Sequence, residues 1–229
     1  MSGSLFFITG TDTGVGKTVV ATALLTAARQ HGLEAIGIKP VAAGCARDEH
    51  GLMNADAIEL LTASSRDLDY CQVNPVALEP AIAPHIAARQ AGIALDAGTL
   101  AEHCQEVAAS GVTIIEGAGG WLVPLNDTET MADLCLKLAA TAILVVGMRL
   151  GCINHALLST AAIEASGVKL AGWFGVCLEP DMPALQENLA TLRSRIAAPC
   201  FGTIPHLDPC NGETAAPHID LRLLLDATR

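Results

Sequence analysis

A lysine–threonine pair, Lys17 and Thr18, closes the glycine-rich stretch TGTDTGVGKT at residues 9–18. Glycines let backbone N–H groups curl around an anion, and a helix that begins at Lys17 would point its positive end at the same place. In loops of this kind the lysine reaches the β- and γ-phosphates of a nucleotide, and the hydroxyl binds Mg²⁺. The spacing departs slightly from G-x-x-x-x-G-K-T, because Gly10 lies too early and Thr11 takes the place of the first glycine. The alternative is a glycine-rich turn that only begins a helix.

A phosphate loop needs carboxylates that complete a magnesium site, and two candidates stand out. Glu116 ends the apolar run VTIIE and is followed by GAGG, which allows a ligand close to the backbone. Asp56, in NADAIEL, lies at the predicted start of a helix. Oxygens from Thr18, Asp56 and Glu116, completed by phosphate and water, would suit an octahedral Mg²⁺. Two plainer interpretations stay open: a solvated glutamate at a strand end, and an acid that stabilises a helix N-terminus.

Lys39 ends a second apolar run, IGIK, and is the other charged residue placed for chemistry. An unpaired ammonium is costly to bury, so a lysine at the end of a buried strand must reach solvent or an anion. Ligands of parallel α/β sheets bind at the carboxyl ends of the strands. Lys39 and Lys17 would therefore lie at the same edge, beside the phosphates. The alternative is a surface lysine that extends into solvent.

The elements that must position these residues alternate between short aliphatic runs and longer helical patterns. We predict strands at 5–9, 35–39, 112–116, 142–147, 170–176 and 200–204, and helices at 17–31, 55–63, 97–109, 131–139, 154–166 and 184–196. Strands that alternate with helices imply βαβ units with right-handed crossovers. We therefore predict an α/β fold of the P-loop NTPase type, a parallel sheet with helices on both faces. We expect a single domain over 1–229, with surface loops at 74–85 and 208–217.

The composition argues against several classes of function. A net charge of −11 disfavours a nucleic-acid partner, because phosphate backbones demand a basic face. The run 142–148 is too short to cross a bilayer, and the opening stretch MSGSLFFITG lacks the features of a signal peptide. The eight cysteines form no C-x-x-C pair, so we expect reduced core thiols rather than a zinc site. We expect a cytoplasmic protein without a membrane anchor. ATP is the expected nucleotide, since no guanine-reading N-K-x-D element occurs.

The chain also contains GTDTGVGKT, KPVAAG, NADA, PHIAA, EGAGGWLVPL and VVGMRLGCINHALLS. Together these segments, which span most of the chain from Phe6 to Pro205, resemble the dethiobiotin synthetases, enzymes of biotin biosynthesis. The resemblance implies a homodimer with Mg²⁺ in each site that joins CO₂ to 7,8-diaminopelargonic acid (7,8-diaminononanoate). It further implies that ATP is consumed, that a carbamic-phosphoric anhydride forms, and that ring closure gives dethiobiotin, ADP and phosphate.

The resemblance also implies roles for individual residues, with Lys39 and Lys17 as the catalytic ones. Around the nucleotide it places Gly14, Val15, Gly16, Lys17, Thr18, Val19, Asp56, Glu116, Gly117, Ala118, Gly119, Pro205, His206 and Leu207. The metal would be held by Thr18, Asp56 and Glu116. Beside the diamine acid it places Thr13, Lys39, Ala43, Leu150, Gly151, Cys152, Ile153 and Asn154. The last five begin a helix that would receive the substrate carboxylate across the dimer interface, since a helix N-terminus suits an anion.

Three positions depart from the family pattern. Gly14 stands where a glutamate is common, which removes a charge near the phosphates, and Ala43 replaces a serine that faces the substrate. Val176 falls near an asparagine that reads adenine, and a valine cannot make that hydrogen bond. These departures leave the nucleotide preference open. His206, in the second segment beside the base, could equally be a surface loop residue.

Two other functions are compatible with a phosphate loop. A regulatory ATPase switch of the partitioning or metallochaperone type often carries an extra lysine early in the loop. This chain has Thr11, Asp12 and Thr13 there, and it lacks the Cys/His clusters of metallochaperones. An amide-forming ligase that acts on a cobalamin precursor would usually be longer and carry a glutaminase domain. The sequence therefore favours dethiobiotin synthesis, with the regulatory switch as the first alternative.

Overall fold

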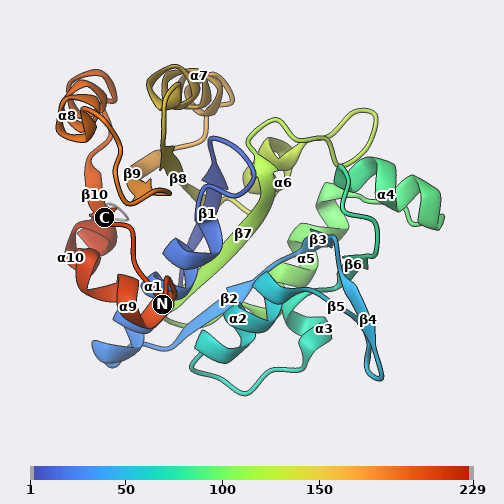
Figure 1. Ribbon diagram of the computed structural model, residues 1–229. Coiled ribbons are helices and arrows are strands. Elements are labelled where there is room, and N and C mark those ends of the chain that lie inside the picture. The colour runs from blue at the N-terminus through green and yellow to red at the C-terminus, as the bar shows by residue number, and fades with distance from the viewer. Residues whose placement is uncertain (1–2, 227–229) are drawn as a thin grey trace.

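The computed structural model describes residues 3–226 and is built around a six-stranded sheet (Figure 1). The strand order is β10–β9–β8–β1–β7–β2, and every neighbouring pair is parallel. The strands are β1 (Ser4–Gly10), β2 (Ala35–Ile38), β7 (Val112–Gly120), β8 (Thr141–Met148), β9 (Leu170–Cys177) and β10 (Cys200–Ile204). Successive residues of a strand point to opposite faces, yet Phe6 and Phe7 are both fully buried. The sheet is therefore covered on both sides, as the aliphatic runs predicted.

Helices cover the two faces and enclose two apolar cores. One core is closed by α1 (Lys17–Gln30), α2 (Ala55–Ala63), α9 (Gly212–Ala215) and α10 (Leu221–Asp226). The other is closed by α5 (Ala97–Val107), α6 (Met131–Lys137), α7 (Cys152–Ala165) and α8 (Leu185–Arg195). The predicted α/β architecture is confirmed. Within residues 3–226, no helix is both long and apolar enough to span a membrane.

Both segments predicted as surface loops contain regular structure, so those predictions were wrong in part. Residues 74–85 hold β6 (Val76–Leu78), which pairs in parallel with β3 (Val41–Ala43), and the start of α4 (Pro84–Ala91). The signal for α4 was present, because proline is favoured at the first position of a helix. Residues 208–217 hold α9 and part of η1 (Ala216–His218). The hairpin of β4 (Ala46–Asp48) and β5 (Gly51–Met53), and the short helix α3 (Tyr70–Val73), are too brief to show a period.

Several predicted element ends also needed correction, each for a local backbone reason. α7 begins at Cys152 rather than Asn154, because Gly151, with φ of 95°, starts the helix from the left-handed region. The helix predicted to reach Ala139 ends at Lys137, and Ala139 itself has φ of 50°, which no α-helix accepts. β2 ends at Ile38, so Lys39 follows the strand rather than closing it.

Candidate active site

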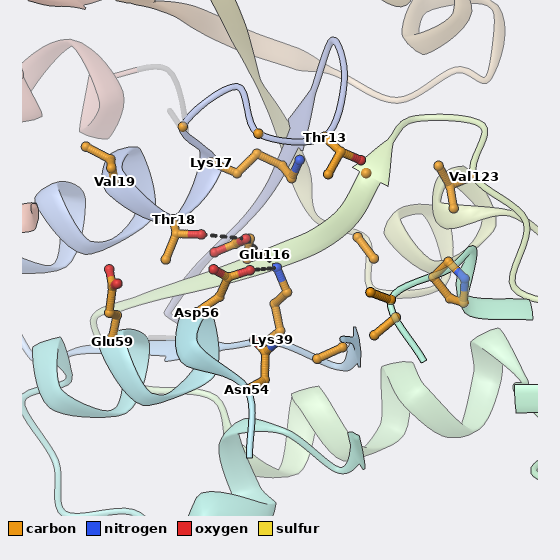
Figure 2. Close-up of a pocket in the computed structure, with 18 of the residues that line it drawn as sticks. Thr13, Lys17, Thr18, Val19, Lys39, Asn54, Asp56, Glu59, Glu116 and Val123 are labelled. Carbon is orange, nitrogen blue, oxygen red and sulfur yellow. Dashed lines mark hydrogen bonds and ion pairs between the residues drawn. The ribbon is translucent and has the colours of Figure 1, made fainter. Parts of the chain in front are cut away.

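A cavity of 870 Å³ opens at the carboxyl ends of β1, β2 and β7, which lie side by side in the sheet (Figure 2). This edge of a parallel sheet is where ligands bind. The lining comes from the loop before α1, the segments around β3 and α2, the segment before α4, and the end of β7. It consists of Thr13, Gly14, Gly16, Lys17, Thr18, Val19, Lys39, Ala42, Ala43, Asn54, Asp56, Glu59, Ala81, Ile82, Ala83, Pro84, Glu116, Ala118, Gly119, Val123 and Cys210.

The glycine-rich loop joins β1 to α1 and has a backbone suited to an anion. Gly14 and Gly16 have φ of 71° and 92°, in the left-handed region that favours glycine. α1 then begins at Lys17 with no side-chain cap, which leaves the N–H groups of its first turn available to a ligand. The Lys17 ammonium folds back over the loop, and its Nζ donates to the carbonyl oxygen of Asp12 at 3.0 Å.

Opposite this loop, four side chains from four segments meet in what we call the Lys39 cluster: Lys39, Asp56, Glu116 and Thr18. The Lys39 Nζ lies 2.9 Å from Asp56 Oδ2 and 2.5 Å from Glu116 Oε1. The Thr18 hydroxyl donates to the same Glu116 oxygen at 3.1 Å. Lys39 and Glu116 are 4% and 0% exposed, so neither is the solvated surface residue that the plainer interpretation allowed. Figure 2 shows these side chains converging below Lys17.

Burial and neighbouring charge shift the pKa values of the two lysines in opposite directions. Burial lowers the pKa of Lys17 to about 8, and repulsion by Lys39 adds to the effect. Burial would also lower the pKa of Lys39, but the carboxylates of Glu116 and Asp56 outweigh it and raise that pKa above its usual range. Burial alone would raise the pKa of Asp56, yet the Lys39 ammonium holds it below the ordinary value. The Lys39 ammonium and the Asp56 carboxylate therefore stabilise each other in their charged forms.

The oxygens of the Lys39 cluster suit a hard divalent cation. Glu116 Oε2 is buried and has no hydrogen-bond partner, which is a costly arrangement unless a ligand completes it. In the part of the chain that the structure describes, no three His, Cys, Asp or Glu side chains form a metal-binding group. A cation here would therefore bind two carboxylates, Asp56 and Glu116, and the Thr18 hydroxyl. Two carboxylates and a hydroxyl fit Mg²⁺, which keeps several waters and phosphate oxygens in its shell.

Most of the residues that the sequence assigned to the site line the cavity. These are Thr13, Gly14, Gly16, Lys17, Thr18, Val19, Lys39, Ala43, Asp56, Glu116, Ala118 and Gly119. Val15 and Gly117 are buried and do not line it. Two predicted segments also lie outside this cavity. Residues 150–154 comprise the turn before α7 and the first residues of that helix, and Leu150 in the turn is fully exposed. Residues 205–207 follow β10, and His206 is exposed. Their contacts with the carboxylate and the base stay predictions.

Sequence reasoning missed part of the cavity wall. Glu59 follows Asp56 by three residues on α2, so both lie on one helix face, and this spacing could have revealed it. The apolar wall formed by residues 81–84 went unassigned because the segment was taken for a surface loop. Val123 lies within the quoted segment EGAGGWLVPL but was assigned no role, and Cys210 reaches the cavity from a distant loop that no local pattern marks.

The three departures from the family pattern have distinct surroundings. A Cβ added at Gly14 would meet nothing within 4 Å, so there is room for the first atom of a side chain at this position. Ala43 lines the cavity and brings no hydroxyl to it. Val176 packs behind the phosphate loop, because a Cβ added at Gly16 would come within 2.9 Å of its Cγ1.

Comparison with known proteins agrees with this geometry. A family model described as an AAA domain matches residues 5–214. The ATP-dependent dethiobiotin synthetase BioD of Cellvibrio japonicus is 55% identical over 228 residues, which is 99% of this chain and 100% of that protein. The protein of the same name from Pseudomonas aeruginosa strain UCBPP-PA14 is 52% identical, over 96% of this chain and 97% of its own. The chain belongs to the dethiobiotin synthetase family.

Membership in the dethiobiotin synthetase family makes the chain an ATP-dependent ligase and disfavours the regulatory switch. Among solved structures, the MinD cell division protein of Aquifex aeolicus matches with a TM-score of 0.57 and 16% identity. That match covers 99% of this chain and 91% of MinD. Identity this low shows a shared fold alone, and it supports the P-loop α/β fold that the glycine-rich loop and the alternation of strands and helices predicted.

Proposed function

We propose that the chain synthesises dethiobiotin from 7,8-diaminopelargonic acid, CO₂ and ATP, with Mg²⁺ as its cofactor. The observation that carries the proposal is the Lys39 cluster, which lines the same cavity as the phosphate loop and includes Thr18 from the end of that loop. Phosphate-binding groups and an additional buried ammonium lie together there, as transfer of a phosphoryl group to an anionic acceptor requires. The family relatives, which carry the same activity in their names, support the assignment.

Phosphoryl transfer is the first task of the site. One amine of the diamine acid adds to CO₂ and loses a proton, which gives a carbamate anion. A carbamate oxygen attacks the γ-phosphorus of ATP, the bond to the bridging oxygen breaks, and ADP leaves. Negative charge then spreads over the γ-phosphoryl oxygens, where Lys17, Lys39 and the loop N–H groups stabilise it. Bound Mg²⁺ would supply further positive charge at the phosphate oxygens.

Ring closure is the second task. The other amine attacks the carbonyl carbon of the carbamic-phosphoric anhydride and loses a proton, while phosphate leaves with the electrons of the broken C–O bond. Holding both amines in one cavity makes this step effectively unimolecular. Ala43, Ile82, Ala83 and Val123 form an apolar wall that suits the hydrocarbon part of the substrate. The reaction needs no covalent enzyme intermediate.

The active unit in this proposal is a homodimer in the cytoplasm. Leu150, in the turn before α7, is 100% exposed, and Leu158, on α7, is 61% exposed. A partner copy would cover these large apolar side chains. Residues 150–154 of one copy would then receive the substrate carboxylate in the site of the other. Free thiols, among them the buried Cys104, Cys135 and Cys152, accord with a reducing compartment.

An assay of ATP consumption with each substrate omitted in turn tests the proposal. We expect turnover only when the diamine acid, bicarbonate and Mg²⁺ are all present, with dethiobiotin detected by mass spectrometry. Rapid ATP hydrolysis that ignores the diamine acid would contradict the proposal and return the regulatory switch as the better function.

A further inference from the structure

A series of buried and partly buried hydrogen bonds connects the backbones that carry Lys39 and Asp56. It begins at the Tyr70 hydroxyl, which accepts from the backbone N–H of Asn54 at 2.8 Å and donates to Asn74 Oδ1 at 2.9 Å. Asn74 Nδ2 then donates to the carbonyl oxygen of Lys39 at 2.7 Å. Both asparagines are buried, at 7% and 3% exposure. Two segments of the active site are thus joined through a single phenol and a single amide.

Each end of this series of hydrogen bonds lies on a backbone segment that carries a side chain of the Lys39 cluster. Asn54 caps α2, its own side chain accepts from the N–H of Ala57, and Asp56 lies in the first turn that this cap fixes. At the other end, Lys39 has both backbone polar groups bonded to the end of α3. Its N–H donates to Val73 O at 2.8 Å, and its carbonyl accepts from Asn74. Proline follows both Lys39 and Asn74 and restricts each to extended backbone.

Helix α3, which carries Tyr70 and ends next to Asn74, is itself held in place by further hydrogen bonds. Asp69 and Gln72 form a capping box at the start of α3. The imidazole of His103, on α5, bonds to the carbonyl oxygen of Gln72 at 2.9 Å. Burial raises the pKa of Tyr70 despite the bond from Asn54, so its hydroxyl stays protonated and can accept and donate at once. The Tyr70 hydroxyl is therefore held in a fixed position between the start of α2 and the end of α3.

We propose that Tyr70 and Asn74 are positioning residues that fix the separation of the Lys39 ammonium and the Asp56 carboxylate. Neither side chain lines the cavity, so neither touches substrate. They act through the backbone. Tyr70 fixes the position of the start of α2, and Asn74 fixes the position of the backbone just after β2. A buried polar group left without its partner is costly, so losing one bond shifts the segment that carried it. This inference rests on the proposed function, since it assigns Asp56 to Mg²⁺ and Lys39 to phosphoryl transfer.

The variant Tyr70→Phe tests the inference, because it removes one hydroxyl and keeps the ring. Removing an outer hydrogen-bond partner of a metal ligand typically costs about 10–100-fold in metal affinity or activity. Tyr70 acts one step further away, through the backbone N–H of Asn54, so we take the lower end of that range, about tenfold. We expect a rise of that size in the Mg²⁺ concentration that half-saturates ADP binding, measured by calorimetry, and a comparable fall in kcat. ADP binding without Mg²⁺ should stay unchanged, because Lys17 and its loop lie outside the chain of bonds.

Ser65→Ala is the matched control. Ser65 Oγ accepts from the N–H of Ala35 at 2.8 Å, which is a similar bond at the opposite end of β2. It should lower the thermal midpoint without changing either the Mg²⁺ dependence or kcat. If Tyr70→Phe also lowers the thermal midpoint but leaves the Mg²⁺ dependence and kcat unchanged, Tyr70 contributes only to stability and the inference is wrong.

Asn74→Asp keeps the test decisive if Tyr70→Phe folds poorly. It retains an acceptor for the Tyr70 hydroxyl but removes the Nδ2 donor to the carbonyl oxygens of Lys39 and Val76. The Lys39 branch is therefore cut, while the bond from the Asn54 N–H to Tyr70 stays. We expect kcat to fall and the Mg²⁺ dependence to stay near that of the wild type; the reverse pattern would overturn the inference. The double variant should be non-additive, since both residues belong to one chain of bonds. The Mg²⁺ dependence of ADP binding reports on Asp56 and needs no diamine acid. A failure of the proposed function, which only assays with the diamine acid would reveal, is therefore distinguishable from a failure of this inference.

Discussion

Lys17 and Lys39 face one cavity, yet the fold holds them in different ways. The hydrogen-bond acceptor of Lys17 is a neutral carbonyl on a glycine-rich loop, and burial lowers its pKa to about 8. Lys39 lies between two carboxylates that raise its pKa. Its backbone N–H and carbonyl are both hydrogen-bonded to residues at the end of α3. The charge of Lys17 is thus poorly compensated until an anion arrives, whereas that of Lys39 is compensated in advance. We propose that Lys17 acts in nucleotide binding and in turnover alike, whereas Lys39 acts mainly in the chemistry that follows binding.

Removing Lys39 should have the largest effect and would test this contrast most severely. Lys39→Ala should lower kcat by about 10²–10³, the typical loss for one well-placed donor at developing charge. ATP binding should weaken far less, because the interaction matters most in the transition state. Lys39→Gln keeps a donor but no charge and should recover little. Steady-state kinetics and calorimetry measure both quantities. Turnover of Lys39→Ala close to that of the wild type would remove the catalytic role.

Removing Lys17 should produce a different pattern. Lys17→Ala should weaken ATP binding by about 1.5–3 kcal/mol, or about ten- to hundredfold, since a hydrogen bond from a charged donor is lost. Turnover should fall with it, because the contact is made in the ground state and the transition state alike. If Lys17→Ala instead lowered kcat and left ATP affinity intact, the division of labour between the two lysines would be reversed.

A third substitution addresses the exposed face of α7, where we expect a smaller effect on turnover. Leu158→Lys should weaken the proposed dimer by about 1.5–3 kcal/mol for each leucine no longer buried. Sedimentation at micromolar concentration should then show monomer, with activity lost on dilution and regained at high protein concentration. Leu223→Lys, an equally simple change at a 43% exposed leucine on α10, should leave the dimer intact. A wild-type protein that sediments only as monomer would contradict the proposed assembly.

Residues whose environment follows from the local sequence were predicted correctly. The aliphatic runs predicted the strands of the main sheet. Thr18, Asp56 and Glu116 lie on three separate segments and approach one another in the structure, and their joint role as metal ligands stays a prediction. Lys39 contacts two carboxylates that are far from it in the sequence. The sequence could therefore place Lys39 at the correct edge of the sheet, but it could not predict these ion pairs. Tyr70 was missed because nothing in the short segment DYCQVN marks a phenol that bridges two distant backbones. The expectation of a single domain over 1–229 stays a prediction.

Product labelling is the most direct test of the central claim, that this cavity closes a ureido ring through a phosphorylated carbamate. The wild-type protein would be given ATP, Mg²⁺, the diamine acid and bicarbonate labelled at carbon. We predict dethiobiotin that carries the label in its ureido carbonyl, with phosphate released in equal amount. Lys39→Ala should form the labelled product far more slowly while still binding ATP. Phosphate release without labelled product, at the same rate in wild type and Lys39→Ala, would contradict the account.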